Sequence, residues 1–216
     1  MRSMASFHSS AAARIAELEL PGNVFVGRVL TDAPRRLASG VEQLDAALRG
    51  GWPRGRLSEI VGQPSSGRTS ALLDTLAAAT RGGEVAAYID ACDSLDPASL
   101  ADAGVVLPRC LWVRPPSAGE AARCAELVLQ SGGFAVVVLD FGDQLPRRVR
   151  SHVWPRLARA AERSRSALVV AAPQRLAGGF AAASVAMQVE RCCWTPGAWP
   201  LFEGLRSHPR RLHCKL

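Results

Sequence analysis

The chain has 216 residues, of which 48% are hydrophobic and 21% are charged, and its mean hydropathy is +0.08. This composition is that of a folded globular domain and excludes a disordered chain. The longest apolar runs, residues 134–139 and 167–172, are far shorter than the roughly 20 residues that a membrane-spanning helix needs. The sequence therefore predicts a soluble protein with no membrane partner.

The formal net charge is +7, and it is unevenly distributed. Residues 144–216 contain 13 Arg or Lys against three Asp or Glu, so the basic charge belongs to the C-terminal third. The six cysteines form no C-x-x-C pair and no Cys/His set with zinc spacing. We expect reduced thiols in a cytosolic protein and no metal site.

The first part of the chain alternates helix and strand patterns. A helix is predicted at residues 4–18, and a shorter one at 39–48 with Ser39 near its cap. Residues 56–61 have the composition of a strand, and residues 69–80 place their leucines on one face of a helix. A loop rich in Gly and Ser connects this strand to this helix.

The alternation continues through the rest of the chain. The next predicted elements are a strand at 84–90, a short helix at 97–103, a strand at 111–113, a helix at 118–130, a strand at 134–140, a helix at 155–163 and a strand at 167–172. Residues 184–190 and 210–215 are predicted to be terminal antiparallel strands. Residues 192–202, with Trp194, Trp199 and Phe202, are predicted to form a loop whose rings would mark an interface if exposed.

This order, with its short connections, predicts a single α/β core with a mostly parallel sheet covered by helices. We expect a lead-in with a short N-terminal helix at residues 1–36, the core at residues 37–190, and a basic segment containing Trp and Pro at residues 191–216.

The loop after the first core strand has the pattern of a phosphate-binding loop. The pattern G-x-x-x-x-G-K-S/T binds phosphate because backbone N–H groups and a helix N-terminus surround it. The lysine neutralises the phosphate oxygens, and the Ser or Thr hydroxyl binds Mg²⁺. Arg68 stands where the lysine belongs. The candidate nucleotide-binding residues are Gly62, Ser65, Ser66, Gly67, Arg68, Thr69 and Ser70, together with Asp140, which ends an apolar strand as a Mg²⁺-supporting carboxylate does.

From residue 37 to about residue 172 the sequence resembles the ATPase core of the RecA recombinase family. The resemblance rests on motifs in the same order as in that family: residues 39–45, residues 50–56, residues 59–67, Tyr88-Ile89-Asp90-Ala91, Leu95-Asp96-Pro97 and the strand that ends at Asp140. It implies a P-loop NTPase core, and it places Gln174 at the position of the family's γ-phosphate-sensing glutamine.

Two positions depart from the family pattern. Cys92 stands where the resemblance implies a glutamate that orients the attacking water, and a mostly neutral thiol cannot replace that carboxylate. A planar guanidinium at Arg68 also differs from a compact ammonium. These departures predict a protein that is not an enzyme, with no catalytic residue, no required cofactor and at most weak binding of ATP and Mg²⁺. Whether the loop binds a nucleotide at all stays open.

The basic residues of the C-terminal third suit DNA phosphates, an acidic protein surface or simply a solvated face. The intervals where RecA proteins have DNA-binding loops, residues 141–154 and 175–183, are short. The candidate DNA- or partner-binding residues are Arg147, Arg148, Arg150, Arg156, Arg159, Arg163, Arg206, Arg210, Arg211 and Lys215.

Among RecA-like proteins the chain most resembles the ImuA family of accessory proteins in bacterial SOS mutagenesis. That resemblance implies a nucleoid-associated adaptor in the bacterial cytoplasm that binds RecA, a polymerase-like ImuB protein, or both, and restrains RecA during error-prone translesion synthesis. The helix predicted at residues 4–18 is one candidate surface. Two alternatives stay open: a weak ATP-dependent mediator of recombination that binds single-stranded DNA, and an SOS inhibitor of cell division.

Overall fold

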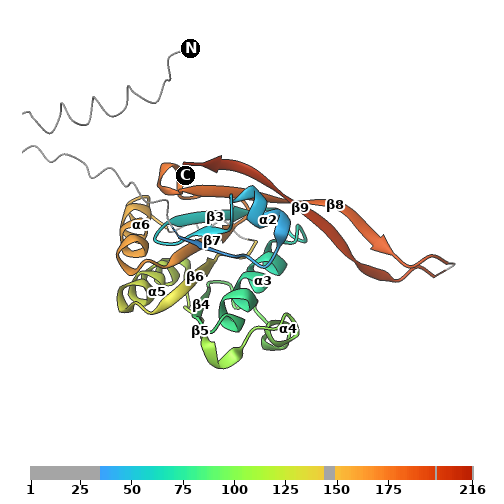
Figure 1. Cartoon of the computed structure of the whole chain (residues 1–216), viewed down its shortest axis with the longest axis horizontal. Helices are drawn as coiled ribbons and strands as arrows, with labels where there is room; N and C mark the ends of the chain where they lie inside the picture. Colours follow the sequence, from blue (N-terminus) through green and yellow to red (C-terminus); the bar gives the residue numbers. More distant parts are fainter. Residues whose placement is uncertain (1–34, 144–148, 198, 216) are drawn as a thin grey trace, which may run out of the picture. The chain divides into compact units, whose positions relative to one another are not determined.

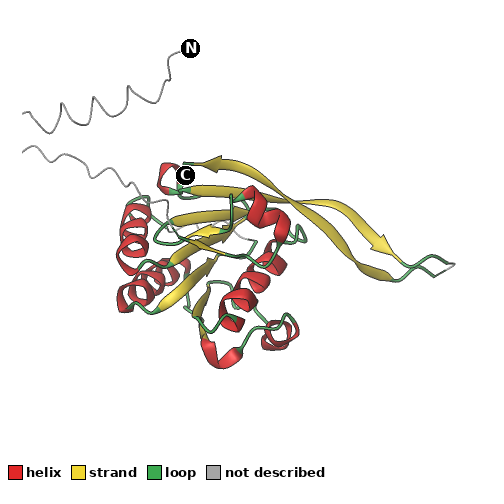
Figure 2. Ribbon diagram, viewed as in Figure 1, coloured by secondary structure: helices red, strands yellow, loops and turns green. Residues whose placement is uncertain are grey.

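The computed structural model describes residues 35–143, 149–197 and 199–215, and its centre is one seven-stranded sheet (Figures 1 and 2). The strands lie in the order β5-β4-β6-β7-β3-β8-β9. All neighbouring pairs are parallel except β8 and β9, which are antiparallel. Their bounds are β3 Leu57–Val61, β4 Val85–Asp90, β5 Cys110–Val113, β6 Phe134–Asp140, β7 Ala167–Ala172, β8 Ala183–Trp194 and β9 Phe202–Cys214.

Helices cover both faces of this sheet. One buried cluster joins it to α2 (Glu42–Ala47), α3 (Arg68–Arg81) and α4 (Pro97–Asp102), and a second joins it to α5 (Ala118–Ser131) and α6 (Val153–Ser164). Strands enclosed in this way need apolar side chains on both faces, which explains the unbroken hydrophobic runs of β6 and β7. The predicted α/β fold with a mostly parallel sheet is confirmed.

Several element bounds differ from the sequence prediction. Helix α6 begins at Val153, two residues before Pro155, because proline is tolerated throughout the first turn, where N–H groups lack intrahelical partners. The pair β1 (Arg36–Leu37) and β2 (Trp52–Pro53) was not predicted, since two residues are too few to show a strand pattern. The helix predicted at residues 4–18 lies outside the described residues, as do Arg147 and Arg148.

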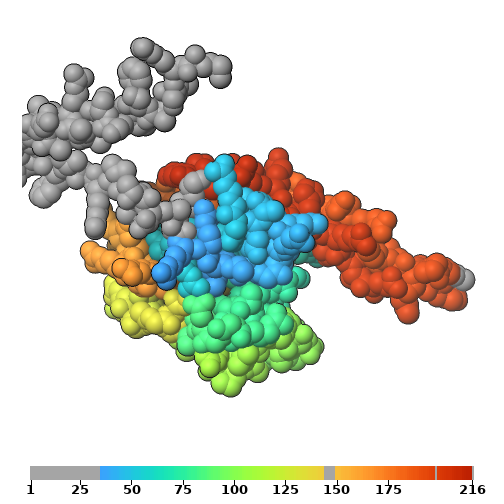
Figure 3. Space-filling view, in the orientation of Figure 1, coloured from blue at the N-terminus to red at the C-terminus, as the bar shows by residue number. Residues whose placement is uncertain are grey.

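The last two strands are much longer than predicted and form a β8–β9 arm that extends beyond the helix-covered core (Figure 3). Residues 183–187 are buried, whereas residues 188–192 and 194 are exposed, so the ladder continues after the core ends. The prediction of a loop at 192–202 is wrong at its ends, because Trp194 pairs with Phe202 in the ladder. Their rings meet edge to face at 5.1 Å, and a cross-strand aromatic contact of this kind stabilises an isolated ribbon.

No helix in the part of the chain that the structure describes is both long enough and apolar enough to cross a membrane.

Candidate nucleotide-binding site

The predicted phosphate-binding loop connects β3 to α3 and adopts a tight, partly left-handed path. Ser65 and Gly67 have φ angles of 60° and 85°. Gly67 precedes α3, and a Cβ there would lie 2.3 Å from the Oγ atom of Ser207 on β9. Glycine is therefore required both by the positive φ and by the close approach of the β8–β9 arm.

The loop encloses a cavity of about 200 Å³ at the N-terminus of the 14-residue helix α3. The first N–H groups of a helix have no intrahelical partner, and they favour an anion at that position. The hydroxyl of Ser66 is buried and has no hydrogen-bond partner among the described residues. The residues present therefore fit a phosphate group, with the hydroxyls of Thr69 and Ser70 exposed at the cavity wall.

Arg68 is folded into the protein rather than toward solvent, with only 5% of its side chain exposed. Its Nη1 donates to the Gly62 carbonyl at 2.6 Å, and its Nη2 donates to the Gly142 carbonyl at 2.8 Å and to Asp143 Oδ1 at 2.9 Å. The guanidinium thus ties the phosphate loop to the turn after β6. A lysine ammonium, which has no planar fork, would not reproduce this arrangement.

Asp140 lies at the carboxyl end of β6, beside the loop, and is 3% exposed. Its Oδ2 accepts a hydrogen bond from the Tyr88 hydroxyl at 2.5 Å, and its Oδ1 accepts one from the Gly142 N–H at 2.8 Å. Burial raises the pKa of Asp140, while these two donors and Arg68 act in the opposite direction. The same burial, together with the Asp140 charge, raises the pKa of Tyr88 well above its usual value.

Cys92 lies after β4, next to the β6 turn, and its Sγ donates to the Phe141 carbonyl at 3.1 Å. Burial raises the pKa of the Cys92 thiol, and the neighbouring carboxylates, Asp140 first, add to the shift. The thiol is therefore predominantly protonated at neutral pH, as the sequence predicts. Asp90 turns the chain here by accepting from the Leu95 and Cys92 N–H groups at 2.8 and 3.2 Å.

Gln174 follows β7, and β7 pairs with β3 so that Ala172 lies opposite Val61. The carboxyl ends of neighbouring parallel strands meet at one edge of a sheet, so Gln174 lies at the same edge as the loop. Its side chain is exposed. The structure thus brings the loop, Asp140, Cys92 and Gln174 to a single edge.

Comparison with known proteins identifies the family to which this chain belongs. The RecA N-terminal domain family matches residues 26–150, which include the phosphate loop and Asp140. The chain belongs to the RecA N-terminal domain family. It is 42% identical to the RecA protein of Borrelia hermsii over 106 residues, or 48% of this chain and 30% of that protein. It is also 42% identical to RecA of Methylococcus capsulatus over 105 residues, again 48% of this chain and 30% of the relative.

Solved structures give the same fold. The RadB recombinase resembles this chain with a TM-score of 0.57 at 21% identity, covering 69% of this chain and 82% of RadB. The matches to curated RecA proteins span less than a third of their length.

The prediction that this chain is not an enzyme is contradicted by these relatives, because RecA proteins and the RadB recombinase are enzymes. That prediction rested on two side chains, Arg68 and Cys92. Phosphate binding by this kind of loop depends mainly on main-chain N–H groups and a helix N-terminus, which do not depend on side-chain type. One departure in the phosphate loop, at Arg68, and one after β4, at Cys92, do not establish a loss of activity.

Sequence reasoning missed Glu59, which is 1% exposed on β3. Its carboxylate accepts from the Leu176 and Ala177 N–H groups at 2.7 and 2.6 Å, from the Ser184 hydroxyl at 2.8 Å and from Arg175 Nε at 3.2 Å. Glu59 therefore fixes the segment that follows Gln174. A charged residue inside the apolar pattern of a central strand was the available signal.

The basic candidates lie on two elements. Arg156, Arg159 and Arg163 are on α6, with Arg150 just before it, whereas Arg206, Arg210 and Arg211 are on β9, with Lys215 just after it. The Lys215 ammonium donates to the Gly179 carbonyl. Among the described residues, no group of three or more His, Cys, Asp or Glu side chains is placed to bind a metal ion.

Proposed function

We propose that this RecA-family protein is a nucleotide-binding accessory protein of DNA-damage tolerance, of the ImuA type, that acts on RecA during SOS-induced translesion synthesis. The observation that carries the proposal is a RecA-family core whose phosphate loop keeps its cradle but is fastened to the β6 turn by Arg68. The core has the RecA-family fold, and Arg68 in its nucleotide loop differs from the family pattern.

In this proposal the loop binds the phosphates of ATP. The N–H groups at the start of α3 would surround the phosphate, and Thr69 would offer its hydroxyl to the Mg²⁺ that accompanies ATP. Arg68 positions the loop, since its guanidinium is already bonded to Gly62 and Gly142. Asp140 stands beside it as the carboxylate that supports the Mg²⁺ shell.

The partners in this proposal are RecA and a polymerase-like ImuB protein. Chains that share a fold can reuse a self-association surface for each other, and this chain is 42% identical to RecA over 106 residues. A copy docked at the end of a RecA filament would present Arg68 in its phosphate loop and Cys92 after β4, and the next RecA subunit would meet an altered surface. Slower RecA strand exchange is the expected consequence.

Pull-down with RecA, combined with strand exchange at increasing concentrations of this protein, tests the proposal. We expect retention of RecA and a progressive fall in exchange rate. Retention of neither RecA nor an ImuB-like protein, with exchange unchanged, would overturn it. Retention of the ImuB-like protein alone would keep the accessory role and remove the action on RecA.

A second candidate is an ATP-dependent recombination mediator that binds single-stranded DNA. The match of the RecA N-terminal domain family across both the loop and Asp140 favours it. ATP turnover stimulated by single-stranded DNA and lost in Thr69→Ala, with faster rather than slower strand exchange, would select this candidate over the first. The control is Ser131→Ala, which removes an exposed hydroxyl at the end of α5.

A further inference from the structure

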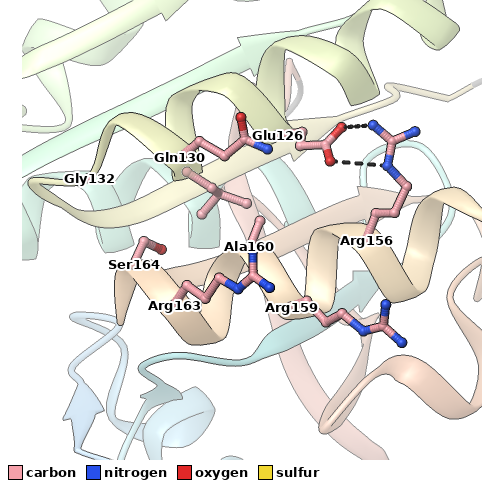
Figure 4. Close-up of a pocket in the computed structure, with 9 residues that line it drawn as sticks. Glu126, Gln130, Gly132, Arg156, Arg159, Ala160, Arg163 and Ser164 are labelled. Atoms are coloured by element: carbon pink, nitrogen blue, oxygen red, sulfur yellow. Dashed lines mark hydrogen bonds and ion pairs between the residues drawn. The ribbon is translucent and has the colours of Figure 1, made fainter.

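A groove runs between α5 and α6, on the face of the sheet opposite α3. Two adjoining cavities of about 600 and 540 Å³ make it up, and both are lined by Glu126, Gln130 and Arg156. Figure 4 shows the larger of the two. We call it the α5–α6 groove. It is distinct from the phosphate loop, which α3 begins, because the two helix layers belong to separate core clusters.

The charge of the α5–α6 groove is strongly positive. Among the described residues, Glu126 is the sole acid that lines the groove. Arg156 already pairs with it, because its Nε donates to Glu126 Oε1 at 3.0 Å and its Nη2 donates to Oε2. The structure gives the guanidinium groups of Arg159 and Arg163 no hydrogen bond or ion pair within the described residues, and Figure 4 shows them beside the cavity. The remaining arginines of the lining are Arg123 and Arg150.

The arginines on α6 form a regular row. Arg156, Arg159 and Arg163 are separated by three and four residues, so they share one side of the helix at intervals of about 4.5 and 6 Å along its axis. Acidic residues three and four apart on a second helix have the same spacing. A groove between two helices is also the shape that receives an amphipathic helix.

The groove also has an apolar component, which favours a protein over a nucleic acid. Leu129 and Ala160 line its floor, and Leu127, which is 56% exposed, lines its wall. A phosphate backbone has no apolar group to place there. No Phe, Tyr or Trp of the described chain lines either cavity, so unpaired bases would find no ring for stacking.

We propose that the α5–α6 groove binds an acidic, amphipathic protein segment, whose carboxylates pair with Arg159 and Arg163 and whose apolar side chains cover Leu127. This site goes beyond the proposed nucleotide site and does not depend on it. Glu126 competes with the incoming carboxylates for Arg156, so it limits the affinity of the groove.

The test uses fluorescence anisotropy with the full chain and a labelled helical peptide of about 20 residues, rich in Glu and Leu at three- and four-residue spacing. We expect Arg159→Gln/Arg163→Gln to weaken binding about tenfold. The matched control, Arg35→Gln/Arg191→Gln, removes the same charge from two exposed positions outside the groove and should change the affinity less than about twofold. An equal loss in both double variants would show non-specific charge attraction and overturn the proposal.

Two further arms separate folding and ligand class. Glu126→Gln frees Arg156 and should raise peptide affinity by about two- to threefold, a gain that misfolding cannot produce. A labelled oligothymidine of similar length provides the nucleic-acid probe. If the α6 double variant lowers oligothymidine binding and leaves peptide binding unchanged, or if no peptide binding is measured, the acidic-segment site is wrong.

Discussion

The phosphate loop and the α5–α6 groove both depend on arginine, but they use it in opposite ways. Arg68 is 5% exposed and donates to two main-chain carbonyls and a carboxylate of its own chain. Arg159 and Arg163 are exposed and have no such partner within the described residues. A buried guanidinium must be paired inside the protein, whereas an exposed one remains available to an external anion. The surroundings, and not the residue type, therefore decide whether an arginine is bonded within its own chain or available to an external anion.

The largest expected effect on the free energy of unfolding comes from removing the buried arginine, Arg68. Arg68→Ala leaves the Gly62 and Gly142 carbonyls without their donor, and we expect the free energy of unfolding to fall by about 2–4 kcal/mol. Arg159→Ala, the exposed counterpart, should change it by less than about 0.5 kcal/mol. Urea unfolding followed by circular dichroism measures both. Equal losses in the two variants would remove the distinction between the two regions.

Tyr88→Phe tests how the protein stabilises the buried Asp140 carboxylate beside the phosphate loop. The variant removes a donor from Asp140, so we expect a loss of about 1–3 kcal/mol near neutral pH. Burial already raises the pKa of Asp140, and losing Tyr88 raises it further, so the penalty grows as pH rises through this pKa and shrinks in acid, where Asp140 is protonated. Unfolding at about pH 4 and about pH 7.5 gives the comparison. A loss that does not depend on pH would show that the Tyr88 hydroxyl does not stabilise the Asp140 charge.

Within the Arg68 network, the smallest effect is expected at its exposed end. Asp143 is 55% exposed, so solvent screens its ion pair, and Asp143→Asn should cost less than about 1 kcal/mol. Added salt should reduce the difference from the unchanged protein. A loss as large as that of Arg68→Ala would mean that the carboxylate, and not the two carbonyls, holds the arginine in place.

The sequence predicts the core well because its strands are buried on both faces and its helices carry clear apolar stripes. Residues 134–140 and 167–172 coincide with β6 and β7. The β8–β9 arm was underestimated because residues outside the core have no burial to impose an alternating pattern. Its ladder depends on cross-strand pairing, which a single strand's sequence does not reveal.

The Gly and Ser pattern of the sequence located the candidate site, but the sequence did not predict the hydrogen bonds inside it. The position of Arg68 as a departure from the RecA pattern is visible in the sequence, but its partners Gly62 and Gly142 depend on how β6 turns. The Glu59 anchor joins residues more than 100 positions apart, a separation that local patterns do not record. Predicting the chemistry from Arg68 and Cys92 alone led to the wrong conclusion that the chain is not an enzyme.

The central claim is that the loop of residues 62–70 binds ATP with Mg²⁺: its main-chain N–H groups surround the phosphates, the Thr69 hydroxyl holds the Mg²⁺, and Arg68 fixes the loop in place. Calorimetry with ATP and Mg²⁺, on the unchanged protein, on Thr69→Ala and on the Ser131→Ala control, tests it most directly. We expect saturable binding that weakens about tenfold in Thr69→Ala and is unchanged in Ser131→Ala. No measurable heat with ATP at millimolar concentration, or equal binding by all three proteins, would contradict the claim.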